Sequence, residues 1–272
     1  MQRNLAMLRN LMEPLLRPGN TLRHVSLLQG TKAYGAHLHP IRVPAREDEP
    51  RDPHESFYWL QEDWLREAAD RHGFAWTILR PQIVFGGALG VAMNPLPALG
   101  AYAAICREEG RPFGFPGGPD LLLEAVDARL LARALEWAAT SPQCRFETFN
   151  IANGDVFVWR NVWPTIAASL GVEPGPDSPL RLSTFLTQRA HVWERIVERR
   201  DLRRIRLPEL LGESHHYADF LFAAGIDAGA TVSPALVSTV KSRRFGFADC
   251  IDTEEMLRHW LRVLVEQRIL PG

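Results

Sequence analysis

The chain has 272 residues, 46% of them hydrophobic, and its 31 basic and 32 acidic residues give a formal net charge of -1. This composition can fill one large domain or two small ones, and it provides no basic surface for a nucleic-acid backbone. No apolar run approaches the roughly 18–20 residues that cross a bilayer. The three cysteines lie far apart and suggest no disulfide framework, so we expect a cytoplasmic protein that binds neither nucleic acid nor membrane.

The first segment has the pattern of an amphipathic helix. From Leu5 to Leu16, leucine and methionine residues recur at intervals of three or four residues, which places them on one helical face. Pro14 is expected to end or kink this helix near Glu13, because proline lacks the backbone N–H that a helix interior needs.

A βαβ unit is predicted over residues 23–80. The run 23–29 is nearly continuously apolar, as in a strand buried on both faces of a parallel sheet. A loop-like stretch, a helix at about 55–72 and a second strand at 74–80 follow. The long loop therefore begins at the carboxyl end of a strand, where functional loops of parallel sheets lie.

The rest of the chain is predicted to be mostly helical. Helices are expected at 95–109 and 126–139, with a strand and turn at 113–118 between them. A further strand at 146–151 returns to the sheet. We expect residues 1–90 to belong to the sheet domain and residues 91–272 to a mostly helical, substrate-binding region.

Four blocks in the first ninety residues carry family signals, and they occur in a fixed order. They are Leu22–Tyr34 (LRHVSLLQGTKAY), Glu47–Arg51 (EDEPR), Ser56–Asp63 (SFYWLQED) and Trp76–Gly86 (WTILRPQIVFG). With two further blocks at 101–110 and 149–159, the chain resembles the progesterone 5β-reductase/iridoid synthase-like (PRISE) short-chain dehydrogenase/reductases. The resemblance implies an α/β fold, the C-terminal part of a Rossmann-like doubly wound parallel sheet, with NADP or NAD as cofactor.

The pyrophosphate-binding motif of that family is not found in its expected context. The family begins with a strand–GxxGxxG–helix unit that binds the dinucleotide at a helix N-terminus. In this chain the only comparable cluster, Gly86–Gly90 (GGALG), follows the βαβ unit and reads better as a loop. We therefore expect that the chain begins partway through the fold, on the order of 100–120 residues into it at roughly 30 residues per βαβ unit.

Lys32 is the clearest catalytic candidate. Short-chain reductases need a hydroxyl near the oxygen that gains charge during hydride transfer, and a cation beside it. The resemblance assigns the cation to the lysine of the GTKAY segment. It places the cofactor near residues at the two strand ends: Gly30, Thr31, Lys32, Arg80, Pro81, Gln82 and Val84.

The catalytic hydroxyl is ambiguous between two neighbours. In the family's NFYY motif the second aromatic is taken as the catalytic tyrosine, and that position in this chain is Trp59, next to Tyr58. An indole N–H donates a hydrogen bond but is not an acid. Tyr58 does the work, or Trp59 supplies only a hydrogen bond, or the chemistry is altered or lost. Packing of both aromatics in the core is a further alternative, and all of these stay open at this point.

A small apolar carbonyl compound is the expected substrate. Tyr34, Phe85, Met93, Phe113 and Phe115 are candidates for its pocket, although core packing is the commoner fate of such residues. No metal site is expected, because the histidine pairs at 37/39 and 215/216 have no third ligand at a metal-binding spacing.

The leading functional hypothesis is NAD(P)H-dependent reduction of an activated C=C bond in an enone or enal, in a truncated form whose activity is doubtful. One alternative is an NAD-dependent epimerase/dehydratase of the extended type. Against it, the fourth residue after Tyr58 is Glu62 and not the lysine of a YxxxK motif. The other alternative is a non-catalytic binding module. A homodimer is one assembly that an unpaired sheet edge would favour.

Overall fold

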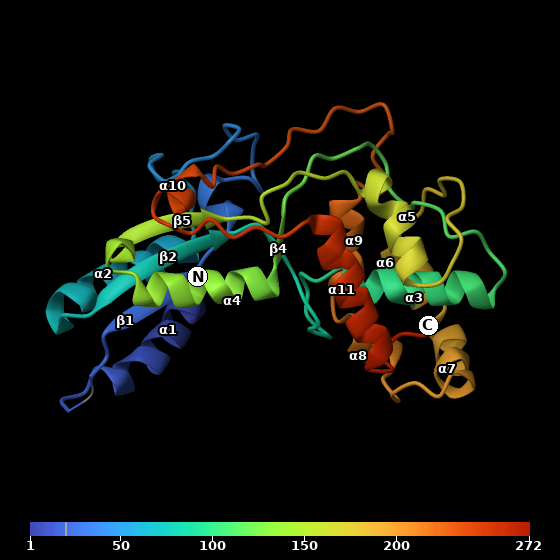
Figure 1. Ribbon diagram of the computed structural model, residues 1–272, viewed down its shortest axis with the longest axis horizontal. Helices are drawn as coiled ribbons and strands as arrows, with labels where there is room; N and C mark the ends of the chain where they lie inside the picture. The colour runs from blue at the N-terminus through green and yellow to red at the C-terminus, as the bar shows by residue number, and fades with distance from the viewer. Residues whose placement is uncertain (20) are drawn as a thin grey trace. The chain divides into compact units, whose positions relative to one another are not determined.

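The computed structural model describes residues 1–19 and 21–272 and divides the chain into two compact units (Figure 1). Unit 1 comprises Met1–Gln82, Arg129–Ala152 and Ala235–Asp249, and unit 2 comprises Ile83–Ala128, Asn153–Pro234 and Cys250–Gly272. The division after Gln82 lies eight residues before the predicted boundary at 90. The later segments Arg129–Ala152 and Ala235–Asp249 also belong to unit 1, because they contribute to its sheet or pack on it.

Unit 1 is built on a parallel sheet with the strand order β1-β2-β5. The strands are β1 (His24–Leu28), β2 (Ala75–Pro81) and β5 (Glu147–Ile151). Every residue of the central strand β2 is buried. The strand predicted to be buried on both faces was the one at 23–29, and that prediction is wrong: β1 lies at the edge of the sheet, its first four residues are half-buried and Leu28 is exposed. Within residues 1–19 and 21–272, no strand pairs with the outer edge of β1.

Helices cover both faces of this sheet. Alternate residues of a strand point to opposite faces, and Trp76 and Ile78 pack against α1 (Gln2–Leu15) and α2 (Phe57–His72). On the other face, Phe149 of β5 meets Trp137 of α4 (Ala128–Thr140) with ring centroids 4.8 Å apart. The segment with α10 (Val240–Arg244) completes that face, with Phe245 at 5.2 Å from Phe149.

Local signals explain where these helices begin and end. Ser56 accepts a hydrogen bond from the Tyr58 backbone N–H and starts α2, and Gly73, at φ 75°, ends it. The helix α1 continues through Pro14 and ends at Leu15, two residues beyond the predicted end near Glu13. Pro14 lies in the last turn, where its missing N–H removes a single intrahelical bond.

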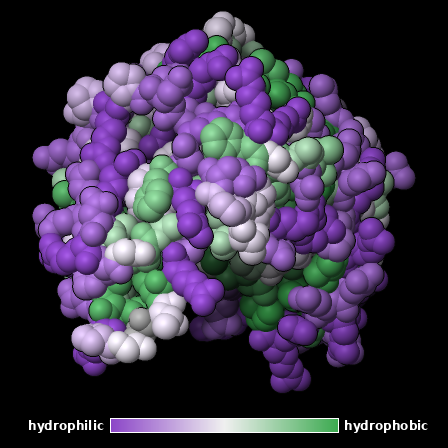
Figure 2. All heavy atoms as spheres, turned by 60° about the vertical axis from the view of Figure 1, so that its left-hand side comes forward, coloured by the Kyte–Doolittle hydropathy of each residue, from purple (hydrophilic) through white to green (hydrophobic). Residues whose placement is uncertain are grey.

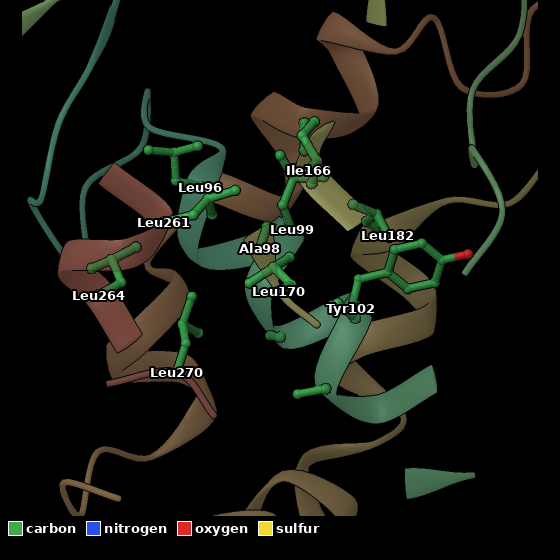
Figure 3. Packing of buried hydrophobic residues seen from close by; sticks show 14 of the residues in the cluster. Leu96, Ala98, Leu99, Tyr102, Ile166, Leu170, Leu182, Leu261, Leu264 and Leu270 are labelled. Atoms are coloured by element: carbon green, nitrogen blue, oxygen red, sulfur yellow. The ribbon is translucent and has the colours of Figure 1, made fainter. Parts of the chain in front are cut away.

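Unit 2 is mostly helical, as predicted, and is organised around α3 (Leu96–Glu108). All residues of α3 from Leu96 to Cys106 are buried, and Leu99 and Tyr102 lie among residues of the surrounding segments (Figure 3). The surrounding helices are α5 (Trp159–Ser169), α6 (Leu182–Thr187), α7 (Ala190–Arg199), α8 (Leu207–Leu211), α9 (Ser214–Leu221) and α11 (Thr253–Glu266). Two short parallel strands, β3 (Ile83–Phe85) and β4 (Ala125–Asp127), were not predicted from the sequence.

The surface carries no continuous apolar belt on the face that Figure 2 shows, where small apolar groups alternate with polar side chains. No helix in the described part of the chain combines the length and apolar character that a membrane crossing requires.

The three cysteines differ sharply in accessibility. Cys106 and Cys144 are buried, and burial raises the pKa of each thiol to about 11, whereas Cys250 is exposed. Only a thiolate attacks a disulfide reagent, and a raised pKa leaves little thiolate at neutral pH. We expect a chromogenic disulfide reagent to titrate one thiol rapidly in the native protein and the other two after unfolding. The rapid phase should disappear in Cys250→Ser; its persistence there would contradict the assignment.

Candidate active site

The carboxyl ends of β1 and β2 bring the predicted catalytic segment together in unit 1. β1 leads through Gln29 and Gly30 into the short 3-10 helix η1 (Thr31–Tyr34), which carries Lys32. The first turn of α2 places the Tyr58 hydroxyl over this point. A Cβ atom on Gly30 would lie 3.5 Å from Tyr58 Oη and 3.6 Å from the Pro81 carbonyl oxygen. The phenol oxygen therefore lies where ligands of open parallel sheets bind.

Tyr58 and Lys32 both keep their polar atoms available. Neither Tyr58 Oη nor Lys32 Nζ makes a hydrogen bond or ion pair with the residues that the structure describes. Burial raises the pKa of Tyr58, while the nearby charge of Arg80 acts in the opposite direction. The phenol is therefore protonated at neutral pH, which is the form that donates a hydrogen bond.

Trp59 points into different surroundings from its neighbour. The Arg51 guanidinium lies 5.1 Å and the Arg80 guanidinium 5.9 Å from the centre of its ring. Its indole Nε1 is buried and lacks a partner in the described chain. Adjacent helical residues point about 100° apart, so the two aromatics cannot share one role without a local rearrangement.

A buried ionic cluster supports the floor of the site, and sequence reasoning missed it. Glu62, on α2, accepts a hydrogen bond from Arg66 at 2.6 Å and lies 3.9 Å from Arg80. Gln29 links the two ends, accepting from Arg80 Nε at 3.0 Å and donating to Glu62 at 3.4 Å. Arg51 adds a third cation 3.5 Å from Glu62. The arrangement fixes the Arg80 charge beside Tyr58.

Tyr34, a predicted pocket residue, is instead held inside unit 1. Its hydroxyl donates to Asn150 Oδ1 at 2.6 Å, and Arg80 stacks over its ring at 5.0 Å. Gln82, predicted near the cofactor, donates from its side chain to the Ala235 carbonyl at 2.6 Å. These contacts give both side chains structural partners within the unit.

The other predicted pocket residues and Val84 belong to unit 2, whereas Thr31 and Pro81 lie in unit 1, in η1 and β2. Phe85, Phe113 and Phe115 are buried in its core, where Phe113 stacks on Trp163 with centroids 4.6 Å apart. Their packing favours the core interpretation. Met93 is exposed and Val84 half-buried, and a role for either at the site stays a prediction.

The glycines of the GGALG segment are explained by close packing within unit 2. A Cβ on Gly86 would lie 3.1 Å from Ala128 Cβ, and one on Gly90, at φ 66°, would lie 3.0 Å from the Glu209 carbonyl oxygen. We expect Gly90→Ala to reduce stability by about 1–3 kcal/mol without changing NADPH affinity. Gly110→Ala is the control, since Gly110 has φ 64° but open space. Denaturant titration should show the larger loss for Gly90→Ala, and a specific loss of NADPH binding would contradict this assignment.

Only part of a dinucleotide site can be assigned to the described residues. A free ammonium on Lys32 and a free hydroxyl on Tyr58 fit the ribose and nicotinamide end of the cofactor. For the pyrophosphate, residues 1–19 and 21–272 offer no open glycine turn at a helix N-terminus. Nor do the described residues group three His, Cys, Asp or Glu side chains for a metal ion.

A family model for a PRISE-like Rossmann-fold domain matches residues 2–209. The chain belongs to the PRISE-like family. An Antirrhinum majus (S)-8-oxocitronellyl enol synthase is 30% identical over 98% of this chain and 70% of its own length. An Arabidopsis thaliana 3-oxo-Delta(4,5)-steroid 5-beta-reductase is 31% identical over the same shares. The family predicted from the ordered sequence blocks is thereby confirmed.

Solved structures confirm the Rossmann-like α/β fold class of this PRISE-like chain. A UDP-glucose 4-epimerase from Thermotoga maritima superposes with a TM-score of 0.60 at 15% identity, over 97% of this chain and 72% of the other. RMD from Pseudomonas aeruginosa, solved with NADPH, gives a TM-score of 0.60 at 14% identity, over 95% and 71%. At these identities the likeness concerns the fold, whose relatives bind NAD or NADPH.

Proposed function

We propose that this PRISE-like protein is an NAD(P)H-dependent oxidoreductase that reduces an activated C=C bond in an enone or enal. The observation that carries the proposal is that the free Tyr58 hydroxyl lies above Gly30. Lys32, whose ammonium is also free, follows Gly30 by two residues. The names of its relatives, enol synthases and a steroid 5-beta-reductase, support the same class of unsaturated carbonyl substrate.

In this mechanism the chain's residues act on the carbonyl oxygen. NAD(P)H, when bound, would supply a hydride to the β-carbon of the substrate. As electrons move toward the oxygen, the Tyr58 hydroxyl donates a hydrogen bond to it, and this bond strengthens as negative charge develops. Water then protonates the α-carbon of the enolate, which completes the saturated carbonyl product. Lys32 would hold the ribose hydroxyls and adds positive charge, and Arg80, fixed by Glu62 and Gln29, contributes a further cation nearby.

The experiment is an assay of the full chain with NADPH and a small cyclic or acyclic enone. We expect enone-dependent loss of NADPH and a saturated ketone as the product, identified by mass spectrometry. Turnover of a nucleotide sugar in place of the enone would overturn the proposal and support an extended epimerase/dehydratase. Glu62 argues against that alternative, because the residue four after Tyr58 is committed to buried ion pairs with Arg66 and Arg80.

A non-catalytic binding module is the second candidate. It is favoured by one observation, namely that the described residues hold no open glycine turn for the pyrophosphate. Calorimetric titration with NADPH separates the two candidates. Saturable binding together with enone turnover supports the reductase, while ligand binding without any NADPH affinity supports the module.

A further inference from the structure

Two buried polar atoms beside the proposed site have no hydrogen-bond partner in the described chain. They are Nε2 of His54 and the indole Nε1 of Trp59. Their rings lie edge to face within unit 1, with centroids 6.0 Å apart. Folded proteins pair nearly all buried polar groups, because an unpaired one costs about 1–3 kcal/mol. Two such atoms on neighbouring rings therefore point to a ligand as their partner.

Asp52 fixes which nitrogen of His54 carries the proton. Its Oδ1 lies 2.7 Å from His54 Nδ1, and the hydrogen bond from His54 is the main cause that lowers the pKa of Asp52. An ionised carboxylate only accepts hydrogen bonds, so Nδ1 of the imidazole is the donor to it. In the neutral ring, Nε2 is then left with a lone pair that has no donor, and it can act as an acceptor.

The Asp52–His54 pair is packed against the turn that carries Lys32. Asp52 Oδ2 also bonds His39 Nε2 at 2.8 Å. Gly35, which ends that turn at φ 77°, leaves room for the contact between His39 and Asp52: a Cβ there would lie 2.6 Å from His39 Nε2 and 2.7 Å from Asp52 Oδ2. The His54 side chain is only 9% exposed. The pair is thus part of the folded unit beside the proposed catalytic turn.

We propose that His54 and Trp59 bind an alcohol hydroxyl of the substrate. The hydroxyl hydrogen is donated to His54 Nε2, and its oxygen accepts from the Trp59 N–H. A carbonyl or ether oxygen only accepts and would leave His54 unpaired, so the pair selects a group that both donates and accepts. This inference rests on the proposed function and narrows its substrate class to enones or enals that carry a hydroxyl away from the C=C bond.

Entry of the ligand requires one covering side chain to move. Both nitrogen atoms are enclosed by protein, and the ring of His37 stands edge-on to His54 with centroids 5.1 Å apart. His37 is exposed, so we expect this side chain to swing outward when the hydroxyl binds.

The test is equilibrium binding of two ligands that differ only by the hydroxyl, a hydroxy-enal and its deoxy analogue, to the full chain with NADP⁺ present. We expect calorimetry to show about tenfold tighter binding of the hydroxylated ligand, the size of one buried hydrogen bond. His54→Phe and Trp59→Phe should each remove most of this preference, and the double variant should lose no more than either alone. His39→Gln, which alters the same Asp52 carboxylate at an exposed position, should keep it.

Three results would each overturn the proposal: equal affinities for the two ligands in the parent protein, no binding of either ligand, or a preference that survives in both single variants. Equal affinities would indicate that an adventitious water is the partner of the two nitrogen atoms. Near-ultraviolet circular dichroism shows whether each variant is folded. If only one of the two single variants folds, that variant alone is enough to test the proposal. Because calorimetry measures binding without turnover, the hydroxyl site and the proposed reductase activity can be contradicted independently of each other. A hydroxyl preference without enone reduction overturns only the reductase, and enone reduction without the preference overturns only the hydroxyl site.

Discussion

Tyr58→Phe is expected to lower kcat/KM for enone reduction by about 100-fold while leaving the affinity for NADPH within about twofold. The substitution removes one hydroxyl and keeps the ring that packs edge to face with Phe57 at 4.6 Å. A positioned proton or hydrogen-bond donor contributes about 10²–10⁴-fold to such reactions. The loss should appear mainly in kcat, since the bond strengthens only as charge develops on the oxygen. The rate of NADPH loss with a small enone is the measurement.

Two further variants make this result decisive. Tyr217→Phe removes a partly buried hydroxyl from unit 2 and should leave the rate unchanged. Trp59→Tyr tests the competing assignment of the catalytic position. If that variant gains activity while Tyr58→Phe loses none, position 59 is the catalytic one and Tyr58 is not the hydrogen-bond donor.

The long elements of unit 1 could be predicted from the sequence because several local signals agree on them. β2 is rich in β-branched and apolar residues and ends at Pro81, and α2 has Ser56 at one end and Gly73 at the other. The short strands β3 and β4 were missed, since three residues carry too little pattern to separate a strand from a loop. The predicted strand at 113–118 is also absent as such: Phe113 makes an isolated bridge to Pro174.

The motif residues of the site could be predicted, but their supporting contacts could not. Lys32 and Tyr58 lie in recognisable blocks of sequence. Gln29 bonds Glu62, 33 residues away, and Arg80, 51 residues away, and only the pairing of β1 with β2 and the docking of α2 bring them together. A pocket role for the apolar candidates stays a prediction for a related reason. Buried phenylalanines such as Phe113 have the same local pattern whether they face a ligand or a core.

Loss of the buried carboxylate should have the largest effect on stability. We expect Glu62→Ala to lower the free energy of unfolding of unit 1 by about 3–5 kcal/mol, because Arg80 would be left as a buried charge without its counter-ion. The side chains of Glu62 and Arg80 are only 4% and 7% exposed. Arg80 would keep its hydrogen bond to Gln29 and its contact with Tyr34, but neither of these partners carries a negative charge at neutral pH. Urea titration followed by tryptophan fluorescence measures the change, since Trp76 lies 4.3 Å from the Arg66 guanidinium in the same cluster.

The same helix offers a matched control for this prediction. Glu67 and Arg71 form an ion pair with the i,i+4 spacing of Glu62 and Arg66, but their side chains are 67% and 66% exposed. Solvent screens such a pair, so Glu67→Ala should change stability by less than about 0.5 kcal/mol. If the two variants lose equal stability, helix propensity or the i,i+4 pairing explains the effect, and burial of the Arg80 charge does not. If only Glu62→Ala is destabilised, charge neutralisation holds the cluster beneath Tyr58. Glu62→Gln would keep an oxygen that can accept from the Gln29 amide but would carry no charge, so this variant should recover only part of the lost stability.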